Sequence, residues 1–372
     1  MKTVFLWMKK EMVLVAAWVL AVCTAFFIPP DLAYLNYIDY HTLGLLLCLM
    51  AVMAGLQGLG IFQKLGESLL KRVKTTRQLE GILVFLCFFS SMLITNDVAL
   101  ITFVPFSITV FKMARLKNRV LPVVAFQTIA ANLGSMATPI GNPQNLYLYS
   151  ASQMGGKEFF LCLAPYTGIA FVGLTVCLLV RKSFPVSAPV FDGKKETMGQ
   201  VRKGIVYGIL FLCCLLSVAK LVPVWGSLLV VLAATLCIDR SVWRRIDYSL
   251  LMTFVGFFLF IGNIGRIPVV SDFLSSWIQG REILVSILSS QVISNVPAAL
   301  LLSGFTHQWN SLLVGTNIGG LGTLIASMAS LISYKYIARM YPQKKGRYLL
   351  LFTGLNLLFL AVLLIGVFLI PQ

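Results

Sequence analysis

The sequence predicts an all-α integral membrane protein built from two inverted repeats, with about nine transmembrane spans and two re-entrant helical hairpins. Three observations lead to this fold class. The 372 residues are 58% hydrophobic and only 12% charged, whereas soluble domains carry about 25% charged residues. The basic residues gather in clusters between apolar runs. In addition, short polar motifs recur in the same order in the two halves of the chain.

The basic clusters predict an orientation in the membrane. A net charge of +17 would suit a nucleic-acid-binding protein if the charges formed one continuous surface. They lie instead at the ends of apolar segments, which is the positive-inside pattern. We therefore expect the lipid bilayer as a partner, no nucleic acid, and a multi-pass protein of the cytoplasmic (inner) membrane. The tracing puts the N-terminus in the cytoplasm and the C-terminus outside.

Residues 1–180 are predicted to form the first inverted repeat. An apolar region at 81–111 carries a polar break at Thr95, Asn96 and Asp97. Its two arms of ~14 residues are too short to cross ~30 Å each, so a re-entrant hairpin is expected. The spans of this repeat are expected at 11–29, 41–61, 121–149 and 159–180.

Residues 181–203 are predicted to form a cytoplasmic connector, and residues 204–372 the second inverted repeat. The second re-entrant hairpin is expected at 282–305, with its break at Ser294 and Asn295. The spans of this repeat are expected at 204–221, 226–239, 248–265, 309–334 and 348–370.

Three short motifs in the first half have counterparts in the second. Because the traced spans run in opposite directions in the two halves, the repeat is inverted, an architecture typical of secondary transporters. The paired motifs are Ile38-Asp39-Tyr40 with Ile246-Asp247-Tyr248, Ser90 to Asn96 with Ser289 to Asn295, and Ala131 to Gly134 plus Thr138 with Thr316 to Gly319 plus Thr323.

Polar residues mark the expected interruptions of helices within the membrane. A helix that ends there leaves backbone groups that need partners, and Asn, Ser and Thr side chains can supply them. The stretch from Thr138 to Asn145 also contains two prolines, so an unwound segment there would offer carbonyl groups to a cation and helix N-termini to an anion. The alternative is a kinked helix whose amides only tie neighbouring helices together.

These interruptions supply the candidate substrate-binding and ion-binding residues. A Na⁺ ion is one candidate ligand near Asn96, Asn132, Asn295 and Asn317, and no other metal and no cofactor is expected besides H⁺ or Na⁺ as coupling ion. The candidates are Thr95, Asn96, Asp97, Asn132, Thr138, Gly141, Asn142, Asn145, Ser294, Asn295, Asn317 and Thr323.

Asp97 is the candidate coupling residue. Among the acidic residues it alone lies well inside an apolar segment, between Ile94 and Val98. An ionised carboxylate there costs several kcal/mol unless it is paired, so a proton, Na⁺ or the backbone amides of the tip are the expected partners. The alternative is that Asp97 only caps the second arm of the hairpin. No Lys or Arg lies deep in a predicted span, so hydroxyls, amides and helix dipoles would have to bind an anionic substrate.

The segments Ser91 to Pro105 and Ala131 to Asn145 resemble the ion transporter superfamily. This superfamily includes citrate and dicarboxylate carriers, arsenite permeases and some Na⁺/H⁺ antiporters. The resemblance implies an inner-membrane transporter with two re-entrant hairpins and, in the dicarboxylate branch, an elevator-type homodimer. That branch has Ser-Asn-Thr at both hairpin tips. This chain has Asp97 and Val296 at the third position, and the acid is closer to the arsenite permease and antiporter branches.

The leading hypothesis is a secondary active transporter of a small anion, either citrate-like or dicarboxylate-like or an inorganic oxyanion, coupled to H⁺ or Na⁺ through Asp97. A Na⁺/H⁺ antiporter and an arsenite efflux permease are the alternatives. An enzyme is not expected, because neither HExxH nor GxSxG occurs and the chain has no paired intramembrane acids.

Overall fold

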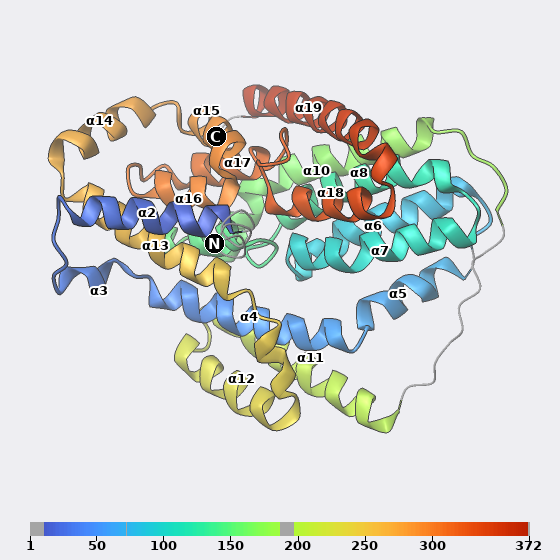
Figure 1. Cartoon of the computed structure of the whole chain (residues 1–372), viewed down its shortest axis with the longest axis horizontal. Coiled ribbons are helices and arrows are strands. Elements are labelled where there is room, and N and C mark those ends of the chain that lie inside the picture. Colours follow the sequence, from blue (N-terminus) through green and yellow to red (C-terminus); the bar gives the residue numbers. More distant parts are fainter. Residues whose placement is uncertain (1–10, 72, 187–196, 371–372) are drawn as a thin grey trace.

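The computed structural model describes residues 11–71, 73–186 and 197–370. Within these ranges the chain is helical, and the one isolated β-bridge joins Thr75 to Pro185. Most of the long helices run roughly along the longest axis of the molecule (Figure 1). Among the described residues, seven helices are long and apolar enough to cross a membrane. The predicted all-α membrane fold is therefore confirmed.

The first half begins with two helices and then forms a series of five units. These units are a long helix, a short connecting helix, a hairpin, a broken span and a second long helix. In order, the elements are α2 (Met12–Ala25), α3 (Ala33–Tyr37), α4 (Tyr40–Gly58), α5 (Ile61–Leu70), α6 (Thr76–Leu93), α7 (Asn96–Met113), η1 (Lys117–Arg119), α8 (Val120–Ser135), α9 (Pro143–Ser152) and α10 (Gly156–Val180).

The second half repeats this series, so that α4 corresponds to α13, α5 to α14, and α10 to α19. The elements are α11 (Met198–Val218), α12 (Val224–Ile238), η2 (Arg240–Arg244), α13 (Tyr248–Gly265), α14 (Pro268–Ile278), α15 (Glu282–Ile293), α16 (Asn295–Ser303), α17 (Trp309–Ile318), α18 (Met328–Met340), η3 (Pro342–Lys344) and α19 (Lys345–Leu369). Five predicted spans are continuous long helices: α4, α10, α11, α13 and α19.

Four other predicted spans differ in form from a regular membrane helix. The first and sixth are α2 and α12, which have only 14 and 15 residues and are shorter than the ~20 that cross a bilayer without tilt or thinning. The spans predicted at 121–149 and 309–334 are each two helices, α8 with α9 and α17 with α18, separated by unwound segments. Both of these interruptions coincide with the Asn- and Gly-containing motifs.

The first hairpin is longer than its predicted bounds of 81–111. Its arms, α6 and α7, have 18 residues each, because the helices continue to Thr76 and to Met113. At 1.5 Å per residue each arm spans roughly 27 Å, so arm length alone does not make this hairpin re-entrant. The tip is enclosed by protein, because Asn96 is only 4% exposed and its backbone amide donates to the carbonyl of Gly141. The second hairpin, α15 and α16, matches the prediction.

In each half one short helix connects the long helix to the hairpin. In the first half α5 lies in the segment between the second span and the first hairpin, where no span is predicted, and α14 holds the corresponding position in the second half. Figure 1 shows α5 and α14 at opposite ends of the long axis. This arrangement agrees with two halves of opposite orientation.

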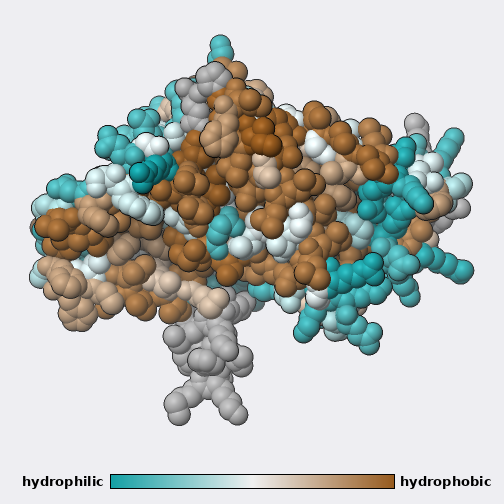
Figure 2. All heavy atoms as spheres, turned by 90° about the horizontal axis from the view of Figure 1, so that it is seen from above, coloured by the Kyte–Doolittle hydropathy of each residue, from teal (hydrophilic) through white to brown (hydrophobic). Residues whose placement is uncertain are grey.

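The outer surface is apolar around the middle of the molecule. In Figure 2 the hydrophobic residues cover most of the visible face, and hydrophilic residues gather mainly at one end. Large apolar side chains on the long helices are well exposed, among them Val180, Leu350 and Phe368. Soluble proteins rarely expose contiguous apolar surface of this extent, so this face suits a lipid environment.

The beginning of the predicted connector is attached to the base of the first hairpin. The amide of Thr76 donates to the carbonyl of Phe184, and the amide of Val186 donates to the carbonyl of Lys74. Residues 187–196 lie outside the described residues, and α11 begins at Met198, inside the range predicted as connector.

Candidate functional site

Each hairpin tip is held by the unwound segment of the span that follows it. The backbone N–H of Asn96 donates to the carbonyl of Gly141 at 3.0 Å, and the N–H of Asn295 donates to the carbonyl of Ala326 at 3.0 Å. Gly141 and Ala326 hold equivalent positions in the two repeats. The same long-range bond therefore closes both tips, as a repeat of this kind requires.

The threonines of the two broken spans make a second pair of equivalent bonds. The hydroxyl of Thr138 donates to the carbonyl of Met92, and the hydroxyl of Thr323 donates to the carbonyl of Gln291 at 3.2 Å. Met92 and Gln291 precede their hairpin tips by the same number of residues. Each threonine thus ties an unwound segment to the first arm of its own hairpin.

The glycines of the repeated motif allow close packing on the hairpin arms. A Cβ atom added to Gly134 would lie 2.2 Å from the carbonyl oxygen of Phe88 and 2.7 Å from Oγ of Ser91. A Cβ atom added to Gly319 would lie 2.7 Å from Oγ of Ser290, which is the residue equivalent to Ser91. Only glycine fits at either contact, because both distances are below any normal Cβ contact.

Asparagine side chains connect the two halves at the centre. Asn317 of the second half accepts a hydrogen bond from Nδ2 of Asn142 at 3.3 Å and donates to Oδ1 of Asn145 at 2.6 Å. Asn132 of the first half accepts from Oγ of Ser327 at 3.0 Å and has its Nδ2 3.5 Å from Oγ of Ser330. Each asparagine therefore contacts the opposite unwound segment.

The first tip joins this network through the side chain of Asn96. Its Nδ2 donates to Oδ1 of Asn132 at 3.0 Å, and its Oδ1 accepts from the backbone amide of Asp97 at 2.9 Å. In the second tip, Oδ1 of Asn295 accepts from the amide of Val296 at 3.0 Å. The helices end at the predicted breaks. The asparagine side chains that bond to neighbouring elements lie at or near these helix ends.

Four helices begin at the tips and interruptions: α7, α9, α16 and α18. Asn142 caps α9 by accepting from the amide of Asn145 at 2.9 Å, and Pro143 follows as the first helical residue. Free amides and the helix dipole give such N-termini a positive partial charge that favours anions.

The backbone of the second tip is strained, and that of the first is not. Ser294 has φ of 75° and ψ of 155°, a region that is essentially reserved for glycine. The equivalent Thr95 has φ of −63° and ψ of 149°, which any residue adopts. Strain of this kind costs about 1–3 kcal/mol and often occurs at functional sites.

A cavity of about 160 Å³ borders the first tip. Thr95, Asp97 and Asn142 line it, together with Arg245 and Asp247 from the start of α13. The sequence indicated no basic residue within reach of the site, because Arg245 lies in a basic cluster between two predicted spans. The fold brings it back to the end of α4.

Specific contacts hold the guanidinium group of Arg245 in place. Its Nη1 donates to the carbonyl of Ala54 at 3.3 Å, and Nη2 lies 3.6 Å from the carboxylate of Asp239. A Cβ atom added to Gly58 would lie 2.1 Å from Nη1, so glycine at this position leaves room for the guanidinium group. Arg245 is therefore a candidate site residue that sequence reasoning missed.

Asp97 faces the same cavity with an unpartnered carboxylate oxygen. Its Oδ1 is buried and has no hydrogen-bond partner among the described residues. Thr95, not Asp97, is the N-cap residue of α7, and Asp97 lies in the first turn. The capping alternative therefore does not describe this residue.

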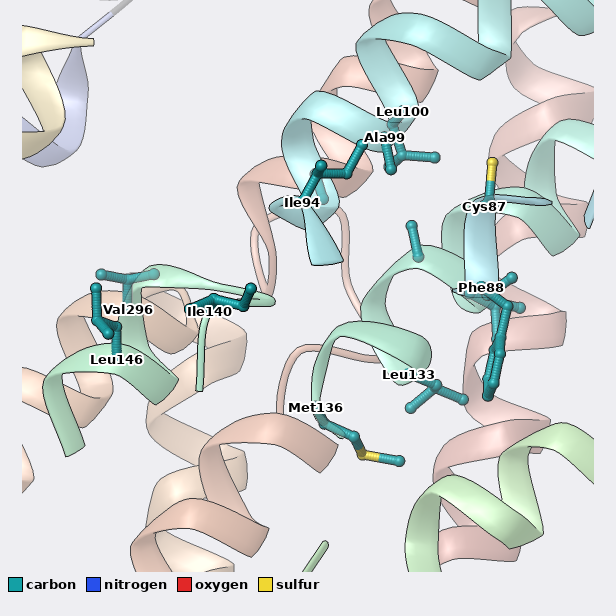
Figure 3. Close-up of a cluster of buried hydrophobic side chains, with 14 of the residues drawn as sticks. Cys87, Phe88, Ile94, Ala99, Leu100, Leu133, Met136, Ile140, Leu146 and Val296 are labelled. Atoms are coloured by element: carbon teal, nitrogen blue, oxygen red, sulfur yellow. The ribbon is translucent and has the colours of Figure 1, made fainter. Parts of the chain in front are cut away.

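The residue equivalent to Asp97 in the second hairpin has an apolar environment. Val296 lies beside Ile140 and Leu146 in the cluster of buried side chains shown in Figure 3. Ile140 and Leu146 also line the cavity of Asp97, so these neighbours do not distinguish the two tips.

A second cavity, of about 480 Å³, borders the second tip. Ser294 and Val296 line it, with Lys335 of α18 and with Asp247 and Leu250 of α13. Asp247 and Leu250 line both cavities, so the start of α13 lies between them. Both tips can thus be reached from the same region of the molecule.

The predicted site residues fall into three groups. Asn96, Asn132, Asn142, Asn145 and Asn317 form the central network; Thr95 and Asp97 face the first cavity, and Ser294 faces the second. The remaining candidates take part in the hydrogen bonds that join each hairpin to the unwound segment of the following span; they are Thr138, Gly141, Asn295 and Thr323. The sequence reasoning missed Ser327 and Ser330, although they are the repeat equivalents of Asn142 and Asn145.

Comparison with known families agrees with this architecture. A family model described as citrate transporter, CitMHS, matches residues 3–308. The chain belongs to the citrate transporter family. It is therefore a membrane transporter and not an enzyme, as the sequence predicted, and the predicted superfamily is confirmed.

Relatives in several organisms carry related names. The inner membrane protein YbiR of Escherichia coli is 32% identical over 304 residues, covering 80% of each chain. An uncharacterised transporter of Methanocaldococcus jannaschii, MJ0456, is 33% identical over 270 residues, covering 72% of this chain and 73% of that one. The silicon efflux transporter LSI3 of rice, Oryza sativa subsp. japonica, is 35% identical over 156 residues, but these cover only 41% of this chain and 31% of LSI3.

A solved structure shares the fold. The transporter YdaH of Alcanivorax borkumensis, whose crystal structure shows an unusual topology, superposes with a TM-score of 0.56. The match covers 91% of this chain and 87% of that chain at 14% sequence identity. At this identity the likeness supports the fold alone.

Proposed function

We propose that this transporter carries a small anion, of the citrate or dicarboxylate class or an inorganic oxyanion, across the cytoplasmic membrane, and that H⁺ or Na⁺ binding at Asp97 drives the transport. The observation that carries the proposal is the cavity at the first tip. It contains both an unpartnered buried carboxylate oxygen, on Asp97, and a guanidinium group, on Arg245.

The anion would bind between the first tip and the unwound segment that starts α9. There it would meet the hydroxyl of Thr95, the N-terminal turns of α7 and α9, and the charge of Arg245. Helix N-termini and hydroxyl groups are common ligands of carboxylates and oxyanions. In the second cavity the cation Lys335 is accompanied by two carboxylates, Glu11 and Asp247, so there the anion would be offered mainly the hydroxyl of Ser294.

Asp97 explains why an anion would need a cation to bind with it. Ionised Asp97 and an anion ~5 Å away repel each other by about 3 kcal/mol at an effective dielectric constant of ~20. A proton or Na⁺ on Asp97 removes this repulsion. Binding of the two ligands is therefore coupled, and the sign of the coupling favours movement in the same direction.

The membrane orientation and assembly belong to the same proposal. The basic clusters before α6, between α7 and α8, and before α19 support an inner-membrane protein with the N-terminus in the cytoplasm and the C-terminus outside. The apolar outer surfaces leave room for the homodimer that the dicarboxylate branch implies.

A neutral oxyacid is the second candidate substrate, and one observation favours it. The first cavity has two carboxylates, Asp97 and Asp247, against one guanidinium that already contacts Asp239. Such a cavity has no excess positive charge for an anion. The name of the rice relative, a silicon efflux transporter, points in the same direction, and arsenite efflux belongs to the same chemical class.

Transport by purified protein in liposomes would test these candidates. Citrate, succinate, sulfate, arsenite and silicic acid would be offered under a pH gradient alone or a Na⁺ gradient alone. We expect uptake of an anion under one of the gradients and its loss in Arg245→Gln, with Arg244→Gln, an exposed neighbour, as the matched control.

Other outcomes would overturn the proposal. Flux of silicic acid or arsenite that Arg245→Gln leaves unchanged would identify a neutral-oxyacid carrier. Exchange of Na⁺ for H⁺ without any added solute would identify a cation antiporter that uses Asp97 directly.

A further inference from the structure

A third cavity, away from the transport site, has the features of an anion-binding pocket. It has a volume of about 440 Å³ and lies where α8, α10 and α19 meet. Its wall contains Lys117, Arg181, Lys344 and Arg347, together with Leu121 and Leu351. We propose that this cavity binds the phosphate headgroup of an anionic phospholipid of the cytoplasmic leaflet.

The charge of the cavity is positive and largely uncompensated. No acidic residue lines it, and Lys117, Lys344 and Arg347 form no salt bridge within the described ranges. The fourth cation, Arg181, contacts the buried carboxylate of Glu80 at 2.6 Å, and Arg119 contacts the same carboxylate at 3.0 Å. Because Glu80 serves two arginines, it leaves no negative charge for the cavity.

Two membrane helices also begin at this cavity. α8 starts at Val120, just after Lys117, and α19 starts at Lys345, between Lys344 and Arg347. Their N-terminal amides add positive partial charge to that of the side chains. Together these groups suit a phosphate, because its oxygens accept several hydrogen bonds at once.

A lipid fits the cavity better than a free anion does. Leu121, Pro122 and Leu351 form an apolar part of the wall directly beside the cations, and Leu350 next to them is 79% exposed. Cations at the starting level of membrane helices stand at the depth of the lipid headgroups. The apolar wall would then take the first part of an acyl chain, which a free phosphate does not have.

The bound lipid would join parts of the two repeats. α8 belongs to the first half and carries Asn132, whereas α19 is the last helix of the second half. A headgroup held by Lys117 on one side and by Lys344 and Arg347 on the other would bridge them. We therefore expect anionic lipid to stabilise the folded transporter.

Thermal unfolding in a neutral detergent would test this inference. Phosphatidylglycerol should raise the Tm by at least about 2 °C, whereas phosphatidylcholine with the same acyl chains should not. The double variant Lys344→Gln/Arg347→Gln should lose this rise. The control Lys112→Gln/Arg244→Gln removes two exposed charges of other basic clusters, so it should keep the rise.

Native mass spectrometry supplies a second measurement, which does not depend on the stability of the variant. The wild type should retain bound phosphatidylglycerol, and Lys344→Gln/Arg347→Gln should not. Equal retention by both proteins would overturn the inference. An equal rise in Tm with inorganic phosphate or glycerol phosphate alone would show a site for a soluble anion instead of a lipid.

Discussion

Replacing Asp97 by asparagine should separate binding of the anion from binding of the coupling ion. The wild-type carboxylate has a buried oxygen without a partner and shares a cavity with Thr95 and Asn142. An ionised carboxylate ~5 Å from the anion costs about 3 kcal/mol, which corresponds to a factor of roughly 100 in affinity. Asp97→Asn keeps the shape of the side chain and removes this charge.

The wild type should therefore bind its anion about 100-fold more weakly in Na⁺-free buffer at high pH than with the coupling ion present. In Asp97→Asn the affinity should be high under both conditions, and a gradient should no longer drive accumulation. Equilibrium binding of the radiolabelled anion identified by the liposome assay measures the affinity. Asp272→Asn, on the exposed side of α14, is the control and should behave as wild type.

The reasoning would be refuted by an Asp97→Asn variant whose anion affinity still depended on pH or Na⁺ as in the wild type. The coupling ion would then bind elsewhere, and the carboxylate of Asp97 would have another role. A variant that bound no anion at all would show that Asp97 contacts the substrate directly.

Three further changes test the packing, the buried ion pairs and the backbone strain of the fold. Gly134→Ala would force a methyl group against a backbone carbonyl of α6, so stability should fall by about 1–3 kcal/mol, measured as a lower Tm in detergent. Glu80→Gln leaves Arg119 and Arg181 without their shared carboxylate; because both are partly exposed, we expect a loss of about 2–3 kcal/mol in the same assay. Ser294→Gly relieves the strained φ and should raise stability by about 1 kcal/mol after the entropy of glycine is counted, while an unchanged or lower Tm would contradict the strain.

The repeat and its interruptions could be predicted from the sequence because their physics is local. A polar Asn-containing break in an apolar segment can exist in a membrane only where the backbone is satisfied by protein or water. Asn96, Asn295, Asn132 and Asn317 therefore stood out without any knowledge of the packing. The structure adds that the four belong to two equivalent sets of bonds.

The features that the sequence did not predict depend on contacts between residues that are far apart in the chain. Arg245 lies 148 residues after Asp97 in the sequence, and nothing local shows that its side chain reaches the end of α4. In the sequence this contact is reflected in Gly58, because only a residue without a Cβ leaves room there for the guanidinium group of Arg245. Likewise α5 was not predicted, because Lys64 within it and the basic residues that follow from Lys71 indicate a connecting loop, although its apolar residues can form one side of a short helix.

The two cavities show that the halves of the molecule are not arranged identically, although the bonds at their tips are equivalent. Asp247, at the start of α13, lines both cavities, whereas its repeat equivalent Asp39, at the start of α4, lines neither of them. Both aspartates cap their helices in the same way, Asp39 by accepting from the amide of Thr42 and Asp247 by accepting from the amide of Leu250. Near Asp39, Tyr147 bonds to Ser303 of the second hairpin at 2.8 Å. Both cavities that border the tips therefore lie beside the start of α13.

An inverted repeat offers a direct route to the opposite arrangement. If the halves exchanged conformations, the start of α4 would lie between the two cavities and the start of α13 would be closed. The bonds from each tip to its unwound segment could persist during such an exchange, since each lies within one half. The bonds of Asn132 and Asn317 cross between the halves, so these are the contacts that would have to re-form as the site turns from one side of the membrane to the other.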